Sequence, residues 1–321
     1  MSVDIPLFCF CIGINKFIVH LNTFTKTFEM RSYYLLLAVL SFTLVVSCKK
    51  EEEVIKEPVQ EQLDPTVSYD LTDVAYGSDP EQVMDIYLPA NRSAESTQVF
   101  FLIHGGGWSA GDKENFQSTF NALKFVYPDC AIVNMNYRLA TNSSPGYPKQ
   151  INDVEKAIQF IFSGKYDLSH EICFLGNSAG GHLAMLYAYK FDDEGYIKAI
   201  CNTVGPADFT DPSYTSEPDF EYGLISLVGP VTYDENPALY QEVSPVYHIT
   251  QNAPKTLSFY GDQDPLVPAT QVTILHDKLS DVSVYNEWTL YAGEGHGNWN
   301  TTNANDYQTK IISFITNHFI H

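Results

Sequence analysis

Ser178 stands in a short segment whose other residues are unusually small. Residues 176–181 read GNSAGG and join an apolar run to a helix-like one. A serine between a strand and a helix, in the pattern G-x-S-x-G, is typical of an exposed nucleophile on a sharp turn. Gly176 and Gly180 are expected because the two backbones come too close for side chains. The amide of Ala179, at the start of the helix, would point at a developing oxyanion.

A second glycine-rich segment lies upstream of this serine. Residues 104–108 read HGGGW and come directly after an apolar run. Three consecutive glycines leave backbone N–H groups unshielded and able to converge on an oxyanion. His104, at the start of the segment, is expected to brace this loop rather than to transfer protons.

Acidic and imidazole side chains follow two later apolar runs. Residues 260–268 read YGDQDPLVP and offer Asp262 and Asp264, and the segment GEGHGNW supplies His296. A serine hydroxyl is a weak nucleophile at neutral pH unless a histidine takes its proton, and a carboxylate orients that histidine. The chain order serine, aspartate, histidine is one of the orders in which this set of residues occurs. The pattern predicts acyl transfer through a covalent intermediate.

Eight segments predict the strands that would position these groups, two opening strands and then six short apolar, β-branched or aromatic runs. They are rich in β-branched and aromatic residues and lie at residues 67–77, 82–89, 99–108, 130–137, 172–178, 199–205, 256–261 and 287–293. Apolar residues at helical spacing occur at 151–162 and again at 303–319. Apolar strands that alternate with helices predict an α/β fold, a mostly parallel eight-stranded sheet with helices on both faces.

The alternation breaks between about residues 208 and 254, where Pro, Asp, Ser and Tyr are frequent. We expect this segment to be a short cap insertion over the sheet. Its aromatic residues are Phe209, Tyr214, Phe220, Tyr222, Tyr233, Tyr240 and Tyr247. At least half of them are expected to form a small core of the insertion, and the others to line a pocket for the acyl or alcohol group.

The N-terminal region reads as an export signal followed by a linker. Residues 33–47 form an apolar run too short for a comfortable membrane span, which takes about 20 residues, and a basic residue precedes this run. The sequence VVSC, ending at Cys48, resembles the lipobox of bacterial lipoproteins. We therefore interpret residues 30–47 as a lipoprotein signal peptide and Cys48 as the lipidated residue. Met30 is then the expected start of the protein, and residues 1–29 are an extension that lies upstream of it.

Several expectations follow from this interpretation. Residues 48–65 are charged and poor in bulky apolar groups, so they are expected to be a disordered tether before a hydrolase domain spanning 66–321. The protein is expected in the bacterial cell envelope, held to the membrane by a lipid anchor, with the outer-membrane surface as one expected location. A buried core helix or an uncleaved anchor at 33–47 is the alternative.

Charge and cysteine content exclude some classes of protein. The formal net charge of −21 argues against a nucleic-acid-binding protein, because phosphate contacts need clustered Lys and Arg. Cys130, Cys173 and Cys201 remain after the expected processing. Each begins or adjoins an apolar run, so they are expected to be buried thiols rather than a disulfide framework.

Taken together, the motifs HGGGW, NYRLA, GNSAGGHLA, GDQDPLVP and GHGNW resemble those of the α/β-hydrolase superfamily. Within it they are similar to the hormone-sensitive-lipase and feruloyl-esterase-like carboxylesterases, over roughly residues 67–319. The resemblance implies Ser178 as nucleophile, Asp264 as acid and His296 as base. It places the oxyanion hole at the amides of Gly106, Gly107 and Ala179. The family spacing G-x-x-D-x-x-V-P favours Asp264 over Asp262.

The resemblance implies a serine carboxylesterase that needs no metal and no organic cofactor. The expected substrates are short-chain or aryl esters, either small molecules or acetyl and feruloyl groups on plant polysaccharides. Two other hypotheses stay open: an amidase or peptidase of the same fold, in particular an aryl-formamidase, and a catalytically silent binding protein. Tyr260 departs from the family, whose members often carry histidine there, but this residue is outside the catalytic set.

The remaining polar residues are given structural roles. His182 is expected to pack within its helix and to point away from the serine. Arg138 and Asp153 are expected to pair. Four acidic residues of the insertion are expected to form a solvated loop rather than a calcium site, because their spacing matches no calcium-binding loop. They are Asp208, Asp211, Asp219 and Glu221.

Overall fold

The computed structural model describes residues 62–216 and 223–321. The described part contains one eight-stranded sheet in the order β1-β2-β4-β3-β5-β6-β7-β8. The strands are β1 (Tyr69–Ala75), β2 (Val83–Leu88), β3 (Val99–Ile103), β4 (Ala131–Met135), β5 (Ile172–Asn177), β6 (Ile197–Thr203), β7 (Lys255–Gly261) and β8 (Asn286–Tyr291). Only the pairs β1–β2 and β2–β4 are antiparallel. The fold is therefore the mostly parallel α/β-hydrolase sheet expected from the sequence.

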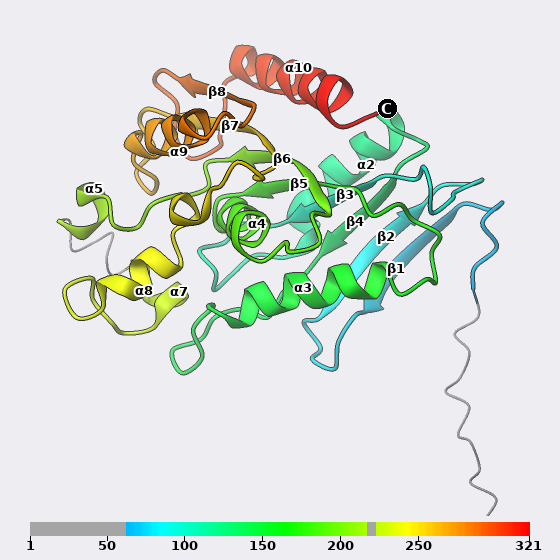
Figure 1. The fold of residues 1–321 in the computed structure, drawn as a ribbon, viewed down its shortest axis with the longest axis horizontal. Coiled ribbons are helices and arrows are strands. Elements are labelled where there is room, and N and C mark those ends of the chain that lie inside the picture. The colour runs from blue at the N-terminus through cyan, green and yellow to red at the C-terminus, as the bar shows by residue number, and fades with distance from the viewer. Residues whose placement is uncertain (1–61, 217–222) are drawn as a thin grey trace, which may run out of the picture. The chain divides into compact units, whose positions relative to one another are not determined.

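Helices cover both faces of this sheet (Figure 1). The long helices are α2 (Gln117–Val126), α3 (Lys149–Ile161), α4 (Ala179–Lys190), α9 (Thr270–Asp281) and α10 (Thr301–His318). The short ones are η1 (Lys113–Phe116), α5 (Pro212–Thr215), α7 (Ile225–Val228), α8 (Pro237–Glu242) and η2 (Pro245–His248). The helices expected at 151–162 and 303–319 are confirmed within a few residues at each end.

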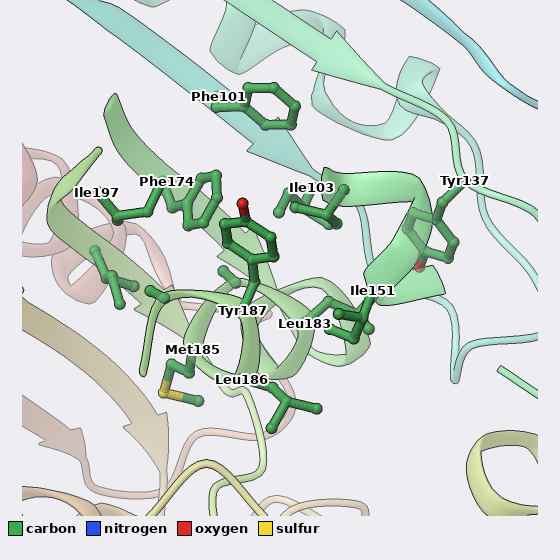
Figure 2. Close-up of a cluster of buried hydrophobic side chains, with 14 of the residues drawn as sticks. Phe101, Ile103, Tyr137, Ile151, Phe174, Leu183, Met185, Leu186, Tyr187 and Ile197 are labelled. Atoms are coloured by element: carbon green, nitrogen blue, oxygen red, sulfur yellow. The ribbon is translucent and has the colours of Figure 1, made fainter. Parts of the chain in front are cut away.

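Alternate side chains of each strand enter two hydrophobic cores, because successive residues of a strand face opposite sides of the sheet. In β3, Phe101 packs with α3 and α4, and Phe100 packs in the core that contains side chains of α2 and α10. Figure 2 shows Phe101, Phe174 and Tyr187 of α4 gathered in the first core. The rings of Phe101 and Phe174 meet edge to face with centroids 5.6 Å apart, a favourable arrangement of aromatic pairs.

The described residues of the insertion between β6 and β7 form the short helices α5, α7, α8 and η2 (Figure 1). On the N-terminal side, the main-chain oxygen of Leu63 accepts a hydrogen bond from Arg92 at 2.9 Å. Gln62 also bonds Asp167 at 2.7 Å. The contacts of the folded domain thus extend to Gln62, a few residues before the boundary expected at 66.

Two expected structural roles are confirmed. Arg138 and Asp153 form an ion pair with 2.6 Å between Nη2 and Oδ1, and Asp153 also accepts a hydrogen bond from the Arg138 amide. Cys130, Cys173 and Cys201 are buried free thiols. Burial raises the pKa of the Cys130 thiol to about 12, so this group is protonated and unreactive at neutral pH.

Two buried histidines make the stability of the domain depend on pH. His182 in α4 and His276 in α9 are 0% and 2% exposed, and burial lowers the pKa of each to about 4. Between this value and the ordinary pKa of about 6.5, the unfolded chain binds one more proton per histidine than the folded chain. We expect each to lower the free energy of unfolding by about 1.4 kcal/mol for every pH unit of acidification in that window.

The variant His276→Asn separates this effect from the titration of carboxylates. The difference in free energy of unfolding between the wild type and this variant should shrink steadily as the pH falls from 6.5 toward 4, because only the wild type carries the titrating imidazole. Urea denaturation at several pH values measures it. A difference that does not change with pH would contradict the neutral, buried state of His276.

Candidate active site

Ser178 occupies a strained turn between β5 and α4. Its backbone has φ 54° and ψ −121°, a region that costs a residue with a side chain on the order of 1–3 kcal/mol. A Cβ atom at Gly176 would lie 2.5 Å from the Gly180 carbonyl oxygen, and one at Gly180 would lie 2.0 Å from that of Ile103. The glycines are thus required by the close approach of strand and helix, for the reason inferred from the sequence.

His296 and Asp264 reach this serine from two other loops at the same edge of the sheet. His296 follows β8 and Asp264 follows β7. The Nε2 atom of His296 lies 2.8 Å from the hydroxyl oxygen of Ser178. Its Nδ1 atom lies 2.7 Å from Oδ2 of Asp264. The structure therefore brings the three residues singled out in the sequence into one hydrogen-bonded chain.

The surroundings of Asp264 fix the roles of the atoms in that chain. The second carboxylate oxygen accepts hydrogen bonds from the amides of Leu266 at 2.8 Å and Val267 at 3.0 Å. An ionised carboxylate only accepts, so Nδ1 of His296 donates to it and Nε2 is free to accept the serine proton. The Asp264 side chain is 0% exposed, and that of His296 is 20% exposed. The imidazole thus stays accessible at the serine while its partner is shielded.

Asp262 lies apart from this chain. It is exposed, and its carboxylate accepts a hydrogen bond from the Gly293 amide at 2.6 Å. This contact joins the loops that follow β7 and β8. Of the two aspartates considered in the sequence, only Asp264 contacts His296 among the described residues.

The glycine-rich loop after β3 runs beside the serine. A Cβ atom at Gly105 would lie 3.2 Å from that of Ser178. Gly106 and Gly107 have φ angles of 123° and 55°, which glycine adopts readily. In the described part of the chain, neither of their amides donates a hydrogen bond to a protein acceptor. Ala179 begins α4, so its amide has no preceding helical carbonyl to bond.

His104 braces this loop, as expected. Its Nδ1 atom lies 2.7 Å from the Gly105 carbonyl oxygen. Its ring stacks on Tyr137, with centroids 4.2 Å apart. The Tyr137 hydroxyl donates to the His104 carbonyl at 2.8 Å. Burial lowers the pKa of His104, so the imidazole is neutral at pH 7.

His182 makes specific polar contacts that sequence reasoning missed. Its Nδ1 atom accepts a hydrogen bond from the Trp108 indole at 3.1 Å, and its Nε2 atom lies 2.8 Å from the Val243 carbonyl oxygen. The expectation that it packs within its helix is right about burial but incomplete. The partners lie 74 and 61 positions away in the chain, so no local pattern could have indicated them.

A small cavity of about 190 Å³ opens at Ser178. It is lined by Gly107, Trp108, Ser178, Pro206, Phe209, Tyr214, Gly223, Leu224, Leu266 and Val267. The insertion thus supplies part of the wall, including two of its aromatic residues. A larger hollow of about 370 Å³ between α2 and α10 is lined by none of Ser178, Asp264 and His296.

The other aromatic residues of the insertion have different surroundings. Tyr233 and Tyr240 meet edge to face with centroids 5.6 Å apart. Tyr247 is 48% exposed, and its hydroxyl lies 2.7 Å from that of Thr210. Phe220 and Tyr222 lie outside the described residues. Of the five described aromatic residues of the insertion, Phe209 and Tyr214 line the cavity, Tyr233 and Tyr240 pack on each other, and Tyr247 is exposed.

The acidic residues of the insertion are not all solvated, which corrects one expectation. Asp211 is 6% exposed and accepts hydrogen bonds from Gln271 at 2.9 Å and from the Ser213 amide at 2.9 Å. Asp208 accepts one from the Thr210 amide. The two bonds of Asp211 cap α5 and attach the insertion to α9. Asp219 and Glu221 lie outside the described residues, and no metal-binding group of side chains occurs within the described ranges.

The expected signal peptide and Cys48 lie outside the described residues. Within residues 62–216 and 223–321, no helix has both the length and the apolar character to cross a membrane.

Comparison with known proteins places this geometry among esterases. Residues 84–279 match the BD-FAE family. Esterase LipC of Mycobacterium tuberculosis is 27% identical over 242 residues, which make up 70% of this chain and 59% of LipC. The chain thus spans less than two thirds of the length of this relative.

Two solved structures share the fold. A truncated carbohydrate esterase from gut microbiota has a TM-score of 0.63 at 22% identity and covers 80% of this chain and 98% of its own. A bifunctional GH43-CE protein of Bacteroides eggerthii has a TM-score of 0.64 at 25% identity. The match covers 80% of this chain and 39% of that protein.

Proposed function

The chain belongs to the BD-FAE family of α/β-hydrolase carboxylesterases, and from this premise we propose that it is a serine carboxylesterase acting on short acyl or aryl esters. One observation carries the proposal: Ser178, His296 and Asp264 form a continuous hydrogen-bonded chain with contacts of 2.8 and 2.7 Å. These three residues lie beside an apolar cavity that can hold an ester and beside a loop whose unbonded amides can contact its carbonyl oxygen.

The proposed reaction has two halves. The Ser178 hydroxyl attacks the ester carbonyl while Nε2 of His296 takes its proton. Asp264 holds the imidazole in the right tautomer and stabilises the imidazolium. His296 then gives the proton to the leaving alcohol, and the acyl group stays on Ser178. Water repeats the sequence on the acyl-enzyme, which releases the acid and restores the serine.

Negative charge develops on the carbonyl oxygen in each half of the reaction. We assign its stabilisation to the amides of Gly106, Gly107 and Ala179. A single donor of this kind typically contributes on the order of 100- to 1000-fold to turnover, because it is already oriented before the charge appears. The N-terminus of α4 adds partial positive charge at the same place.

The natural substrate is proposed to be an ester carried by a plant polysaccharide or its fragments, with acetyl and feruloyl groups as candidates. The support is chemical and comparative. Aromatic walls such as Phe209 and Tyr214 suit aryl and sugar groups, and the related Bacteroides eggerthii protein is described as a bifunctional GH43-CE.

A substrate panel tests the esterase proposal against its alternatives. The panel contains p-nitrophenyl acetate, acetylated xylan, methyl ferulate and N-formylkynurenine. Hydrolysis of the first three, with little release of formate from the fourth, supports the esterase. A clear preference for N-formylkynurenine would indicate an aryl-formamidase, and inactivity on all four would indicate a binding protein.

The size of the cavity predicts a preference for short acyl chains. Its volume of about 190 Å³ is below the roughly 300–1,000 Å³ of pockets that hold drug-sized ligands. We expect kcat/KM for p-nitrophenyl esters to be highest between acetate and butyrate and to fall toward the laurate. A maximum at the laurate would reverse the assignment.

Leu224 offers a way to tie this preference to the cap. It lines the cavity and is 4% exposed, so Leu224→Ala should move the maximum toward longer acyl chains. Tyr233→Ala is the matched control, because Tyr233 belongs to the insertion without lining the cavity. If both variants keep the wild-type profile, the insertion does not set acyl specificity.

The protein is further proposed to be a lipoprotein of the bacterial cell envelope, anchored through Cys48. The support is the signal-like sequence before this residue and the general rule that two lipid chains hold a protein stably where one is marginal. Cys48→Ala should block processing or move the protein from the membrane fraction to the soluble fraction. Unchanged fractionation together with an unchanged mass would reject the anchor.

A further inference from the structure

The side chain of His182 connects the glycine-rich loop to the cap. Its imidazole is 0% exposed. On one side it meets the Trp108 indole, with 3.1 Å between Nε1 and Nδ1. On the other it meets the carbonyl oxygen of Val243, the residue that directly follows α8, at 2.8 Å. One buried ring thus joins three segments that are distant in the sequence.

The two partners fix the tautomer of this imidazole. A carbonyl oxygen only accepts and an indole N–H only donates. Nε2 of His182 must therefore carry the proton and donate it to Val243, and Nδ1 must be the acceptor for Trp108. Both ring nitrogens are satisfied, so the side chain has a single orientation within the domain.

Trp108 needs such a fixed partner because its backbone is strained. Gly106, Gly107 and Trp108 form a run with φ angles of 123°, 55° and 61°. The first two are glycines, but a bulky residue in this region costs on the order of 1–3 kcal/mol. The conformation persists only if surrounding contacts hold it. The Trp108 carbonyl accepts hydrogen bonds from the Ala140 amide at 2.8 Å and from the Gln150 side chain at 2.6 Å. The indole adds contacts with His182 and with Phe209, whose ring lies 5.9 Å away between centroids.

We propose that His182 is a positioning residue for the oxyanion hole. Its bond to Trp108 holds the amides of the glycine-rich loop in place, and its bond to Val243 fixes the position of this loop relative to the insertion. This inference rests on the proposed esterase function. His182 lies one turn after the nucleophile, and its amide donates to the Ser178 carbonyl at 3.0 Å. A shift of the ring would therefore displace the loop relative to the serine that it serves.

Two substitutions separate the two hydrogen bonds of the imidazole. In His182→Asn the side-chain oxygen can occupy the position of Nδ1 and accept the hydrogen bond of Trp108. The side chain is too short to donate to the Val243 carbonyl. In His182→Gln the amide nitrogen can reach Val243, but no acceptor remains at the place of Nδ1. A third variant, Trp108→Phe, keeps one aromatic ring in the wall and removes the indole N–H together with the volume of the second ring.

We expect His182→Gln and Trp108→Phe to lower kcat on p-nitrophenyl acetate by about 10- to 100-fold, somewhat less than the loss of a whole oxyanion donor. KM should stay within about threefold, because the loop matters more in the transition state than in the ground state. His182→Asn should keep more of the activity than either. Binding of a trifluoromethyl ketone, whose oxygen becomes anionic when Ser178 adds to it, should weaken in proportion to kcat.

His276→Asn is the matched control for burial. His276 is also a buried histidine, with Nδ1 at 2.9 Å from Asn286 and with a tryptophan nearby, Trp288 at 6.3 Å between ring centroids. His276 does not line the cavity, so the variant should lower the melting temperature without changing kcat. If His182→Gln and Trp108→Phe behave in the same way, His182 is only a packing residue and the proposal is wrong.

Two more results bear on the proposal. An Asn variant as slow as the Gln variant would overturn the claim that the Trp108 bond carries the effect. If the His182 variants fail to fold, the proposal is tested by Trp108→Phe alone. An unchanged kcat and an unchanged affinity for the ketone in that variant would overturn it. The failure of the esterase proposal is distinguishable, because the wild type itself would then neither hydrolyse the ester nor bind the ketone.

Discussion

Replacing Ser178 by alanine should lower ester turnover by about a million-fold, leaving only the residual rate that the oxyanion hole and substrate binding support. Without the hydroxyl, no acyl-enzyme can form, and the imidazole of His296 has no proton to take. The fold should persist, because the change removes one oxygen atom from a turn that Gly176 and Gly180 already permit. Steady-state turnover of p-nitrophenyl acetate measures the loss, and circular dichroism checks the fold.

Ser169→Ala is the control for this experiment. Ser169 is 5% exposed, and its hydroxyl donates to the Thr97 carbonyl at 3.0 Å, away from the cavity. The same chemical change at this buried position should leave kcat at the wild-type value. More than a few per cent of wild-type activity in pure Ser178→Ala protein would remove Ser178 as the nucleophile.

Replacing Asp264 by asparagine should lower kcat by about ten-thousand-fold, as the loss of the correct histidine tautomer does in serine proteases. An asparagine amide can turn its NH₂ group toward Nδ1 of His296. The ring would then carry its proton on Nε2, where it can no longer accept one from Ser178. The measurement is kcat for the same ester as a function of pH.

Asp262→Asn is the matched comparison, since the two aspartates lie two residues apart on one loop. Asp262 accepts a hydrogen bond from the Gly293 amide, so its replacement should affect the loop mainly through stability. If Asp262→Asn proves the more damaging to kcat, the acid of the catalytic set has been assigned to the wrong residue.

Much of the fold was predictable because its signals are local. The central strands are short apolar runs such as VFFLI in β3, whose side chains are all fully buried. The turn around Ser178 was predictable for a related reason, since Gly176 and Gly180 report a close approach of backbones that no other residue tolerates. The order of serine, aspartate and histidine then limited the candidates to a few positions.

Contacts between distant segments could not be predicted in this way. His182 looks like an ordinary helical residue, and only the positions of Trp108 and Val243 in space give its ring two partners. Asp211 looks like part of a solvated loop, yet α9 brings Gln271 to its carboxylate. In both cases the sequence carries the polar group, but the partner that satisfies it is set by tertiary packing.

The most direct test of the account is to identify the residue that carries the covalent intermediate. The wild type, Ser178→Ala and Asp264→Asn are each treated with a fluorophosphonate probe, digested and analysed by mass spectrometry. The account predicts one adduct, on Ser178, which forms slowly in Asp264→Asn and not at all in Ser178→Ala. An adduct on another residue that parallels the loss of esterase activity, or full activity in protein modified at Ser178, would contradict it.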